Sequence, residues 1–330
     1  METCKADPAI QRVEVEGFKF PLGAYPVEPM KPKAGYTLQF EPADGGEHDA
    51  DWEEWPDRYV FDAVIPADRV EPLCRMLFSL LPGRIYPILD VLGNDAYREI
   101  DPYIAYDLIA AERFVDNVRK YRDFLFEDGL IGFGAMGEEP FYYVFVDEHK
   151  IITIRAQTDL KEKVEKVLQA FDLEVCEEPA GADAAAHEHR SVLLMPDDRP
   201  DLLGPDEIVE RLRDQWQLLL NVDPDSNLDD EGKTLGATLW RCIARCERDA
   251  QPPKYAEVML RAGSLRQAEE TTFDAIEEIS NPEEAWDDVI IVASIRVKPD
   301  QMPKLKGAPK KAKGDRGGEA RILAARFLES

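Results

Sequence analysis

The order in which strand and helix patterns follow one another constrains the fold of this chain more than any other feature of its sequence. Between residues 191 and 297, apolar runs and amphipathic patterns succeed one another as strand, helix, strand, strand, helix, strand. The strands are expected at 191–195, 238–246, 255–262 and 289–297, and the helices at 205–219 and 264–279. This order is typical of a ferredoxin-like sandwich, in which two helices cover one face of an antiparallel sheet. The sequence therefore predicts one such module at 190–300.

The preceding part of the chain, 58–178, fits the same plan with additions. A strand, a helix and a strand are expected at 59–65, 66–81 and 85–92, and a helix with a closing strand at 158–176. Between them, Asp101 and Pro102 suit the N-cap and first turn of a long helix, and three short strand patterns follow it. The predicted fold class is α+β: two tandem ferredoxin-like (βαββαβ-type) sandwich modules, the first with an inserted long helix and extra strands.

Three further segments lack the periodicity of packed elements. Residues 1–57 are predicted to be an N-terminal extension with short strands and with proline-rich and acidic loops. Residues 179–189, rich in alanine and small polar residues, are predicted to be the linker between the modules. Residues 301–330 are predicted to be a basic flexible tail, because lysine, glycine and proline offer little apolar surface for packing.

The charge of the chain is strongly negative and unevenly distributed. The formal net charge is −27 at pH 7, but from Lys304 onward eight Lys or Arg stand against three Asp or Glu, which leaves −32 for the rest and +5 for this tail. So acidic a body would be repelled by nucleic acid and by anionic membranes. The expected partners are therefore proteins, with self-association as one form. Nucleic acid is an alternative for the tail only, where its binding would be weak and salt-dependent.

Neither export nor membrane insertion is expected from the sequence. The chain begins without the apolar segment of a signal peptide, and no run approaches the roughly 20 apolar residues of a membrane span. Its five cysteines are widely scattered, which is not the pattern of a disulfide framework. A cytoplasmic protein without a membrane partner is the resulting expectation.

A loop after the helix expected at 205–219 carries oxygen ligands at alternate positions, as EF-hand calcium loops do. These residues are Asp223, Asp225, Asn227, Asp229 and Glu231. The turn position holds Leu228 where glycine is needed, and the closing position holds Thr234 where a bidentate glutamate is needed. An ordinary polar loop is therefore the preferred interpretation, and a calcium site is the alternative.

Two histidines offer a second candidate for metal binding. His187 and His189 flank Glu188 and could supply two imidazoles, but the other histidines are only His48 and His149, and no cysteine pair has ligand spacing. Linker composition is the preferred explanation of the pair, and metal binding is the alternative. The sequence thus predicts no metal site, and we expect chelators to change neither stability nor ligand binding.

No cofactor is predicted from the sequence. Residues 132–137 match the pattern GxGxxG, but the dinucleotide fingerprint requires a helix to begin inside the motif. Here an acidic pair, a proline and an aromatic strand pattern follow the glycines. A glycine-rich hairpin or bulge is therefore the preferred interpretation.

Acid–base catalysis in this chain would have to rely on carboxylates, because there are only four histidines and no GxSxG motif. The best candidates follow the strand expected at 85–92, where carboxylates mix with aromatic and basic side chains. They are Asp90, Asp95, Glu99 and Asp101, together with Tyr97 and Arg98. Helix capping and loop solvation are the simpler explanation of this group.

Strand alternation groups three arginines in the second module. If Trp240 and the residues that alternate with it face the helices, Arg241, Arg245 and Arg296 fall together on the opposite face of the sheet. Such a face would suit an anionic ligand, acidic groups of the first module, or a second subunit. We therefore expect these arginines to form a ligand-binding or interface surface.

Three functional hypotheses follow from these patterns. The leading one is a non-catalytic binding, regulatory or scaffolding protein that acts through the surfaces of two α+β modules. The second is an enzyme that uses a carboxylate-rich cleft around Asp90 to Asp107, with or without a divalent metal. The third is an adaptor whose basic tail engages an acidic partner or nucleic acid.

Overall fold

The computed structural model describes residues 3–43, 55–195, 199, 201–249, 251–281, 285–301 and 320–328. The chain divides into two compact units that are each built from two stretches of sequence. Unit 1 consists of residues 1–91 and 102–220, and unit 2 of residues 92–101 and 221–330. Within the predicted N-terminal extension, residues 44–54 lie outside the described part.

Unit 1 is built on a nine-stranded sheet with the order β13-β7-β6-β9-β10-β11-β5-β4, and β8 pairs with β6 beside this path. The strands are β4 (Gly35–Glu41), β5 (Arg58–Val64), β6 (Arg84–Asp95), β7 (Arg98–Ala105), β8 (Ile109–Ala110), β9 (Ile131–Gly137), β10 (Tyr142–Val146), β11 (Ile152–Gln157) and β13 (Leu218–Leu220). From β6 through β9, β10, β11 and β5 to β4, each neighbouring pair is antiparallel. Most of this sheet is therefore built from antiparallel strand pairs, which need no parallel crossover connections.

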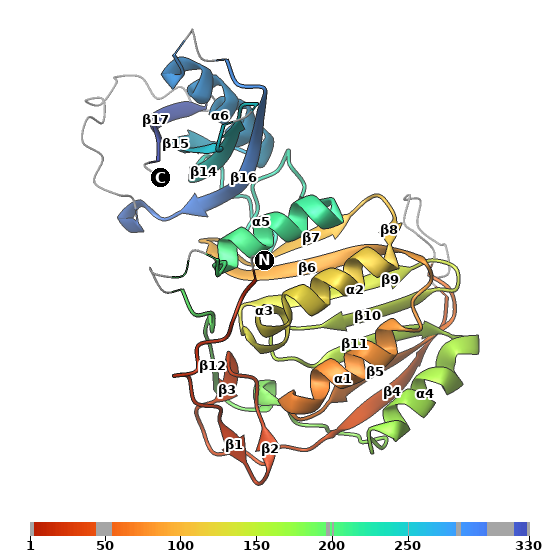
Figure 1. The fold of residues 1–330 in the computed structure, drawn as a ribbon. Coiled ribbons are helices and arrows are strands. Elements are labelled where there is room, and N and C mark those ends of the chain that lie inside the picture. Colours follow the sequence, from red (N-terminus) through yellow and green to blue (C-terminus); the bar gives the residue numbers. More distant parts are fainter. Residues whose placement is uncertain are drawn as a thin grey trace. The chain divides into compact units, whose positions relative to one another are not determined.

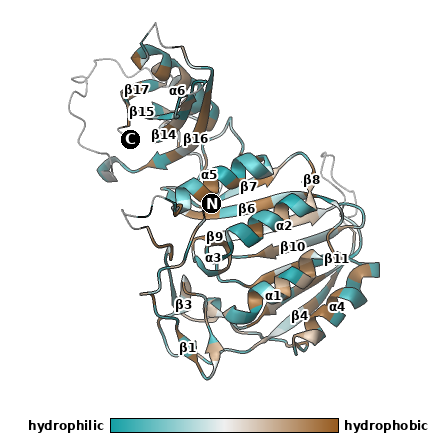
Figure 2. Cartoon of the chain, viewed as in Figure 1, coloured by the Kyte–Doolittle hydropathy of each residue, from teal (hydrophilic) through white to brown (hydrophobic). Residues whose placement is uncertain are grey.

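Helices cover one face of this sheet (Figure 1). They are α1 (Ala67–Phe78), α2 (Ala111–Lys120), α3 (Arg122–Glu127), α4 (Lys161–Ala170) and α5 (Pro205–Trp216), with a 3-10 turn, η1 (Thr158–Leu160), before α4. Along β10, Tyr142, Val144 and Val146 are fully buried while the alternating residues are only half-buried, as expected for a sheet with one face on the core. Figure 2 shows the outward sides of α2 and α5 as largely hydrophilic. Within the described residues, no helix combines the length and apolar character needed to cross a lipid bilayer.

A small N-terminal substructure adjoins the sheet within unit 1. It contains β1 (Glu14–Val15), β2 (Phe18–Lys19), β3 (Ala24–Pro26), the 3-10 turn η2 (Ala182–Ala184) and β12 (His187–His189). β12 pairs antiparallel with β3, and Ala182 is buried against Phe18, Phe20 and Val64. The segment predicted as a linker, 179–189, is thus held inside unit 1 by backbone pairing, which requires no apolar periodicity in the side chains.

Unit 2 is a four-stranded antiparallel sheet with the order β16-β14-β15-β17 and one helix. Its elements are β14 (Thr238–Glu247), β15 (Lys254–Ala262), α6 (Leu265–Ile279), β16 (Asp288–Val297), the 3-10 turn η3 (Pro299–Gln301) and β17 (Arg321–Phe327). α6 contacts all four strands. Ser264 caps this helix by accepting a hydrogen bond from the Gln267 backbone amide, at 3.3 Å.

The mixed α+β class and the mostly antiparallel pairing agree with the sequence prediction, whereas the tandem ferredoxin-like arrangement is not confirmed. The helix predicted for the start of the second module is α5, and it belongs to unit 1, where Trp216 packs on Phe114 with ring centroids 5.0 Å apart. Residues 191–195 form only an isolated bridge, between Leu193 and Ala6. Unit 2 therefore has the order ββαββ, and its fourth strand is β17.

Two other segments differ from their predictions. Asp101 and Pro102 lie within β7 instead of opening a helix, and the following helix, α2, begins only at Ala111. Asp101 binds Arg98 of the same strand at 2.6 Å, so its carboxylate is engaged by a side chain rather than by helix amides. In the region predicted as a flexible tail, Arg321–Phe327 pairs with β15, while residues 302–319 lie outside the described part.

Candidate metal centre

Three of the four histidines of the chain meet in unit 1. His149 lies in the turn between β10 and β11, and His187 and His189 are the two ends of β12. Residues two apart on a strand point to the same side, so β12 presents both imidazoles in one direction. One ring nitrogen of each histidine lies within 4.8 Å of one ring nitrogen of each of the others.

The geometry of the cluster is close to that of a metal site with three imidazole ligands. The Nε2 atoms of His149 and His187 are 3.0 Å apart. The three ring centroids are 4.7, 4.8 and 4.9 Å apart, and the ring planes cross at 73 to 80°. In a tetrahedral zinc site with Zn–N distances of about 2.0–2.1 Å, two ligand nitrogens are about 3.3 Å apart. A small adjustment of these rings would therefore accommodate a zinc ion.

The other ring nitrogen of each histidine faces an oxygen acceptor. Nδ1 of His187 donates to the carbonyl oxygen of Ala185 at 2.8 Å, and Nδ1 of His189 donates to that of Gly129 at 2.6 Å. Nδ1 of His149 lies 3.5 Å from carboxylate oxygens of both Asp147 and Glu148. Because a carbonyl oxygen can only accept, Nδ1 of His187 and Nδ1 of His189 each carry a proton, so the neutral form of each ring has an unprotonated Nε2 that can bind a cation.

The surroundings of the cluster favour the neutral form of His189 and place negative charge beside His149. Burial lowers the pKa of His189, and the neighbouring histidines His149 and His187 lower it further. For His149, burial also acts to lower the pKa, but the contact with Asp147 and the negative charges of Asp147, Glu148 and Asp183 outweigh it, and the net direction is upward. The same carboxylates that attract a proton would attract a divalent cation held by His149.

Two local features hold the cluster in place. Gly23 and Gly129 pack backbone to backbone so closely that a Cβ on Gly129 would overlap the carbonyl group of Gly23. This contact positions the Gly129 carbonyl that binds His189. In the turn that carries His149, the Lys150 ammonium is buried and donates to the carbonyl oxygen of Ile131 at 2.6 Å, while Asp147 accepts from a backbone amide of the same turn.

Four of the five side chains of the EF-hand-like loop form hydrogen bonds or ion pairs within unit 2. Asp225 forms a bidentate pair with Arg266, at 2.6 and 3.0 Å, and Asp229 accepts from the backbone amides of Glu231 and Lys233. Asn227 accepts from Arg296, while Asp223 accepts from the Asp225 amide. Within the described residues, groups of three or more metal-type ligands occur only at the histidines and at Asp147, Glu148 and His149.

The residues predicted to form a catalytic carboxylate cluster are divided between the two units. Asp90 lies on β6 in unit 1, whereas residues 92–101 belong to unit 2. There Asp95 binds Arg296, Asp101 binds Arg98, and the backbone amides of Tyr97 and Glu99 donate to Asp95 and Asp230. Burial raises the pKa of Asp101 despite the opposing effect of Arg98. The carboxylates of Asp95 and Asp101 are therefore engaged in ion pairs with arginines of unit 2.

The three sheet arginines do not share one face. A register shift between β14 and β16 at Ile243/Ala244 places Arg296 directly opposite Trp240, on the side of the sheet that α6 covers. Arg241 lies on the other side and binds Glu257 at 2.7 Å, and Glu257 also binds Arg326 at 2.6 Å. Arg245, in the same alternation as Arg241, binds Glu247 at 2.8 Å. The bulge, which side-chain periodicity does not reveal, separates Arg296 from the other two.

Asp90 should make the stability of unit 1 depend on pH. Burial, with a smaller contribution from Glu148, raises the pKa of its carboxyl to about 6 in the folded protein, above the ordinary value of 3.8. Folding therefore disfavours the ionised form, and stability should fall as pH rises from about 4 to about 6. We expect Asp90→Asn to remove this loss and to raise the free energy of unfolding at pH 7 by up to about 3 kcal/mol. Urea unfolding at pH 4.5 and pH 7 measures both values.

A matched control for this pH effect is Asp116→Asn on α2, whose side chain is 65% exposed. This variant should follow the wild-type pH profile. An Asp90→Asn protein with an unchanged profile between pH 4.5 and pH 7 would show that the carboxyl of Asp90 is not the group responsible.

His149 is the candidate metal ligand that sequence reasoning missed. It is separated from His187 by 38 positions, and nothing in its local pattern connects it with β12. The available signal was the scarcity of histidine, four in the whole chain, together with the i, i+2 spacing of His187 and His189.

The glycines of residues 132–137 have a structural role in β9, where the ring of Phe145 packs over Gly132 and Gly134. No protein-family model matches this chain, and comparisons with curated proteins and with solved structures gave no match.

Proposed function

We propose that this protein is a metalloprotein whose unit 1 binds one divalent transition-metal ion through the Nε2 atoms of His149, His187 and His189. The observation that carries the proposal is the convergence of three imidazoles whose opposite nitrogens are each directed at an oxygen acceptor. This pairing of ligand and acceptor is the usual arrangement of histidines that bind a metal. Histidines that merely lie in a loop are not expected to show this arrangement.

Zinc is the metal that this ligand set suits best. Imidazole nitrogen binds zinc well, and the near-equal spacing of the three rings fits three corners of a tetrahedron. No further histidine, cysteine, aspartate or glutamate joins the three histidines in the part of the chain that the structure describes. The fourth position is therefore open to water or to an added ligand, as in zinc sites with three protein ligands.

The metal would connect two segments that pair with different neighbours. His149 belongs to the β10–β11 hairpin of the large sheet, whereas β12 pairs with β3 in the N-terminal substructure. Coordination would join them directly, so binding should stabilise this part of unit 1. The proposal develops the hypothesis of a binding protein, and it reverses the expectation that chelators have no effect.

Zinc titration of metal-free protein tests the proposal. We expect one zinc ion per chain, and His189→Ala should weaken binding by about 100-fold or more because one of three ligands is lost. At a free zinc concentration of 100 times Kd, the wild-type protein should gain about 2.7 kcal/mol of stability. Competition with a chromophoric chelator gives affinity and stoichiometry, and X-ray absorption gives the number of imidazole ligands.

The fourth histidine provides the matched control. His48→Ala removes the fourth histidine of the sequence and retains all three proposed ligands, so it should leave zinc affinity unchanged. Equal losses in His48→Ala and His189→Ala would indicate nonspecific binding and contradict the proposal. A lack of stoichiometric binding by the wild-type protein would contradict it directly.

A further inference from the structure

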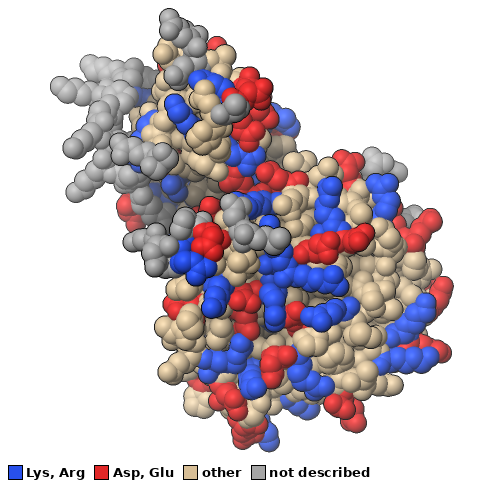
Figure 3. Space-filling model, viewed as in Figure 1, with Lys and Arg blue, Asp and Glu red and all other residues tan. Residues whose placement is uncertain are grey.

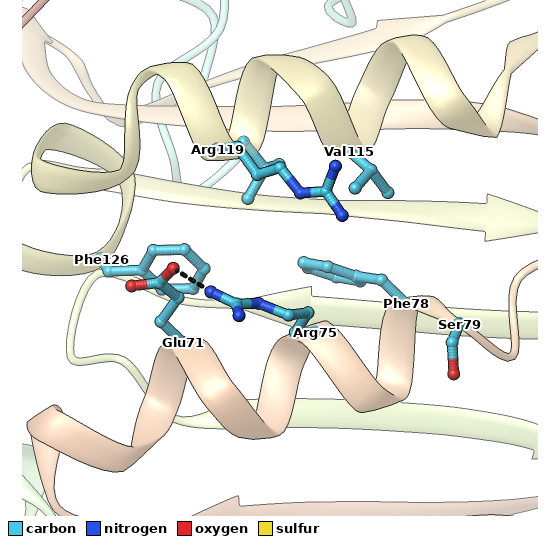
Figure 4. A pocket seen from close by; sticks show the side chains of 8 residues that line it. Glu71, Arg75, Phe78, Ser79, Val115, Arg119 and Phe126 are labelled. Atoms are coloured by element: carbon cyan, nitrogen blue, oxygen red, sulfur yellow. Dashed lines mark hydrogen bonds and ion pairs between the residues drawn. The ribbon is translucent and has the colours of Figure 1, made fainter.

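Unit 1 has a pocket between α1 and α2 that none of the zinc ligands lines. Its volume is about 160 Å³ (Figure 4). Phe78, Val115, Val118 and Phe126 form its apolar wall. Phe78, Val118 and Phe126 are each 5 or 6% exposed, so this wall is continuous with the hydrophobic core. The pocket is therefore a hollow between packed helices rather than a gap between loops.

The size and lining of the pocket suit one small apolar group. A cavity of about 150 Å³ lined by aliphatic and aromatic side chains accommodates benzene. The pocket between α1 and α2 has this volume and two phenylalanine rings in its wall. A single aromatic ring would fill the space beside these two phenylalanine rings.

Positive charge gathers at the opening of this pocket. Arg75 of α1 and Arg119 of α2 both line it, and Figure 4 shows their guanidinium groups over the space between the two helices. Arg75 binds Glu71 at 2.8 Å, and Glu71 also binds Arg122 at 2.6 Å, so one carboxylate serves two guanidinium groups. Lys and Arg gather over this part of unit 1 (Figure 3), although the chain as a whole carries −27.

Arg119 has the capacity to bind an added anion. Its ion pair in the structure is with Asp116 at 3.5 Å, and the two side chains are 63% and 65% exposed. Such an exposed pair contributes little and is readily exchanged for another partner. A guanidinium group can hold a carboxylate through two parallel hydrogen bonds, which also fixes its orientation.

We propose that this pocket binds a small aromatic monocarboxylate, with the ring against Phe78 and Phe126 and the carboxylate at Arg119 and Arg75. The apolar wall selects the ring, and the two arginines select the negative charge. This proposal does not depend on the metal centre, because none of the three histidines contributes to the pocket.

Titration of the full-length protein with phenylacetate, followed by NMR, tests this site. For a ligand of this size we expect a Kd of about 0.1–1 mM and shifts at Val115, Val118 and Phe126. Phenylacetamide has the same shape without the charge, and it should bind at least about fivefold more weakly. Arg119→Gln should reduce phenylacetate affinity about five- to tenfold and leave phenylacetamide affinity unchanged.

Two further variants make the outcome decisive. Arg69→Gln on α1 removes a half-exposed arginine that pairs with Asp172 and does not line the pocket, so it should bind phenylacetate as the wild type does. Val115→Phe should fill the pocket and abolish binding while the protein stays folded by circular dichroism. Equal affinity for phenylacetate and phenylacetamide, an equal loss in Arg69→Gln, or shifts confined to other parts of the protein would overturn the proposal.

Discussion

Trp216→Ala should lower the free energy of unfolding of unit 1 by about 3–5 kcal/mol. Trp216 is fully buried at the end of α5, and its ring packs on Phe114 of α2 at 5.0 Å. Truncation would remove a large apolar side chain and leave a cavity between the two helices. Hydrogen exchange of the full-length protein should show lower protection in α2, α5 and β13, and no change in β14 or β15.

Trp216→Phe is the informative comparison for this prediction. The indole nitrogen of Trp216 is buried and has no hydrogen-bond partner among the described residues, so replacing indole by phenyl removes an unpaired polar group and retains most of the contact area. We expect this variant to lose much less stability than Trp216→Ala. If Trp216→Ala instead lowered protection in β14 and β15, α5 would belong with the second sheet, as the periodicity of the sequence predicts.

Asp95→Ala should destabilise unit 2 by about 3–5 kcal/mol. The Arg296 guanidinium binds both carboxylate oxygens of Asp95 at 2.8 to 3.0 Å, and the Arg296 backbone amide donates to the same carboxylate at 2.7 Å. The Arg296 and Asp95 side chains are 3% and 0% exposed, respectively. Removal of the carboxylate would leave a buried guanidinium group with only neutral acceptors, such as Asn227.

A double-mutant cycle separates the cost of an unpaired charge from the value of the pair. Arg296→Met combined with Asp95→Ala removes both charges, and the double variant should be more stable than Asp95→Ala alone. Urea unfolding followed at unit 2 resonances provides the three free energies. A double variant as unstable as the sum of both single variants would show that the two side chains act independently.

The Asp225–Arg266 pair is a control with the same chemistry at the surface of unit 2. It is also bidentate, but the side chains are 53% exposed for Arg266 and 66% for Asp225. Solvent already screens these charges, so Asp225→Ala should change stability little. A large loss in this variant would indicate that the loop which carries Asp225, rather than burial of charge, limits the stability of unit 2.

The sequence alone was sufficient for elements whose patterns are local. β14, β15, β16 and α6 lie close to their predicted positions, because alternation of apolar residues, amphipathic spacing and the Ser264 cap act within a few residues. The amphipathic pattern of α5 likewise identified a helix with one apolar face. A local pattern cannot show which other element covers that face. For this reason the predicted boundary placed α5 in the second module, whereas α5 belongs to unit 1.

Long-range contacts decided the features on which the candidate sites depend. The bulge between β14 and β16 places Arg296 on the same side of the sheet as Trp240. The strands β12 and β3 pair although they are more than 160 residues apart in the sequence, and the hydrogen bond between Tyr25 and Glu188 links the same two strands. The histidine cluster depends on where that strand and the β10–β11 turn meet. Residue type and spacing therefore determined the secondary structure of much of this protein. Which side chains came together was decided by backbone pairing between distant segments, and a local sequence pattern carries no record of that pairing.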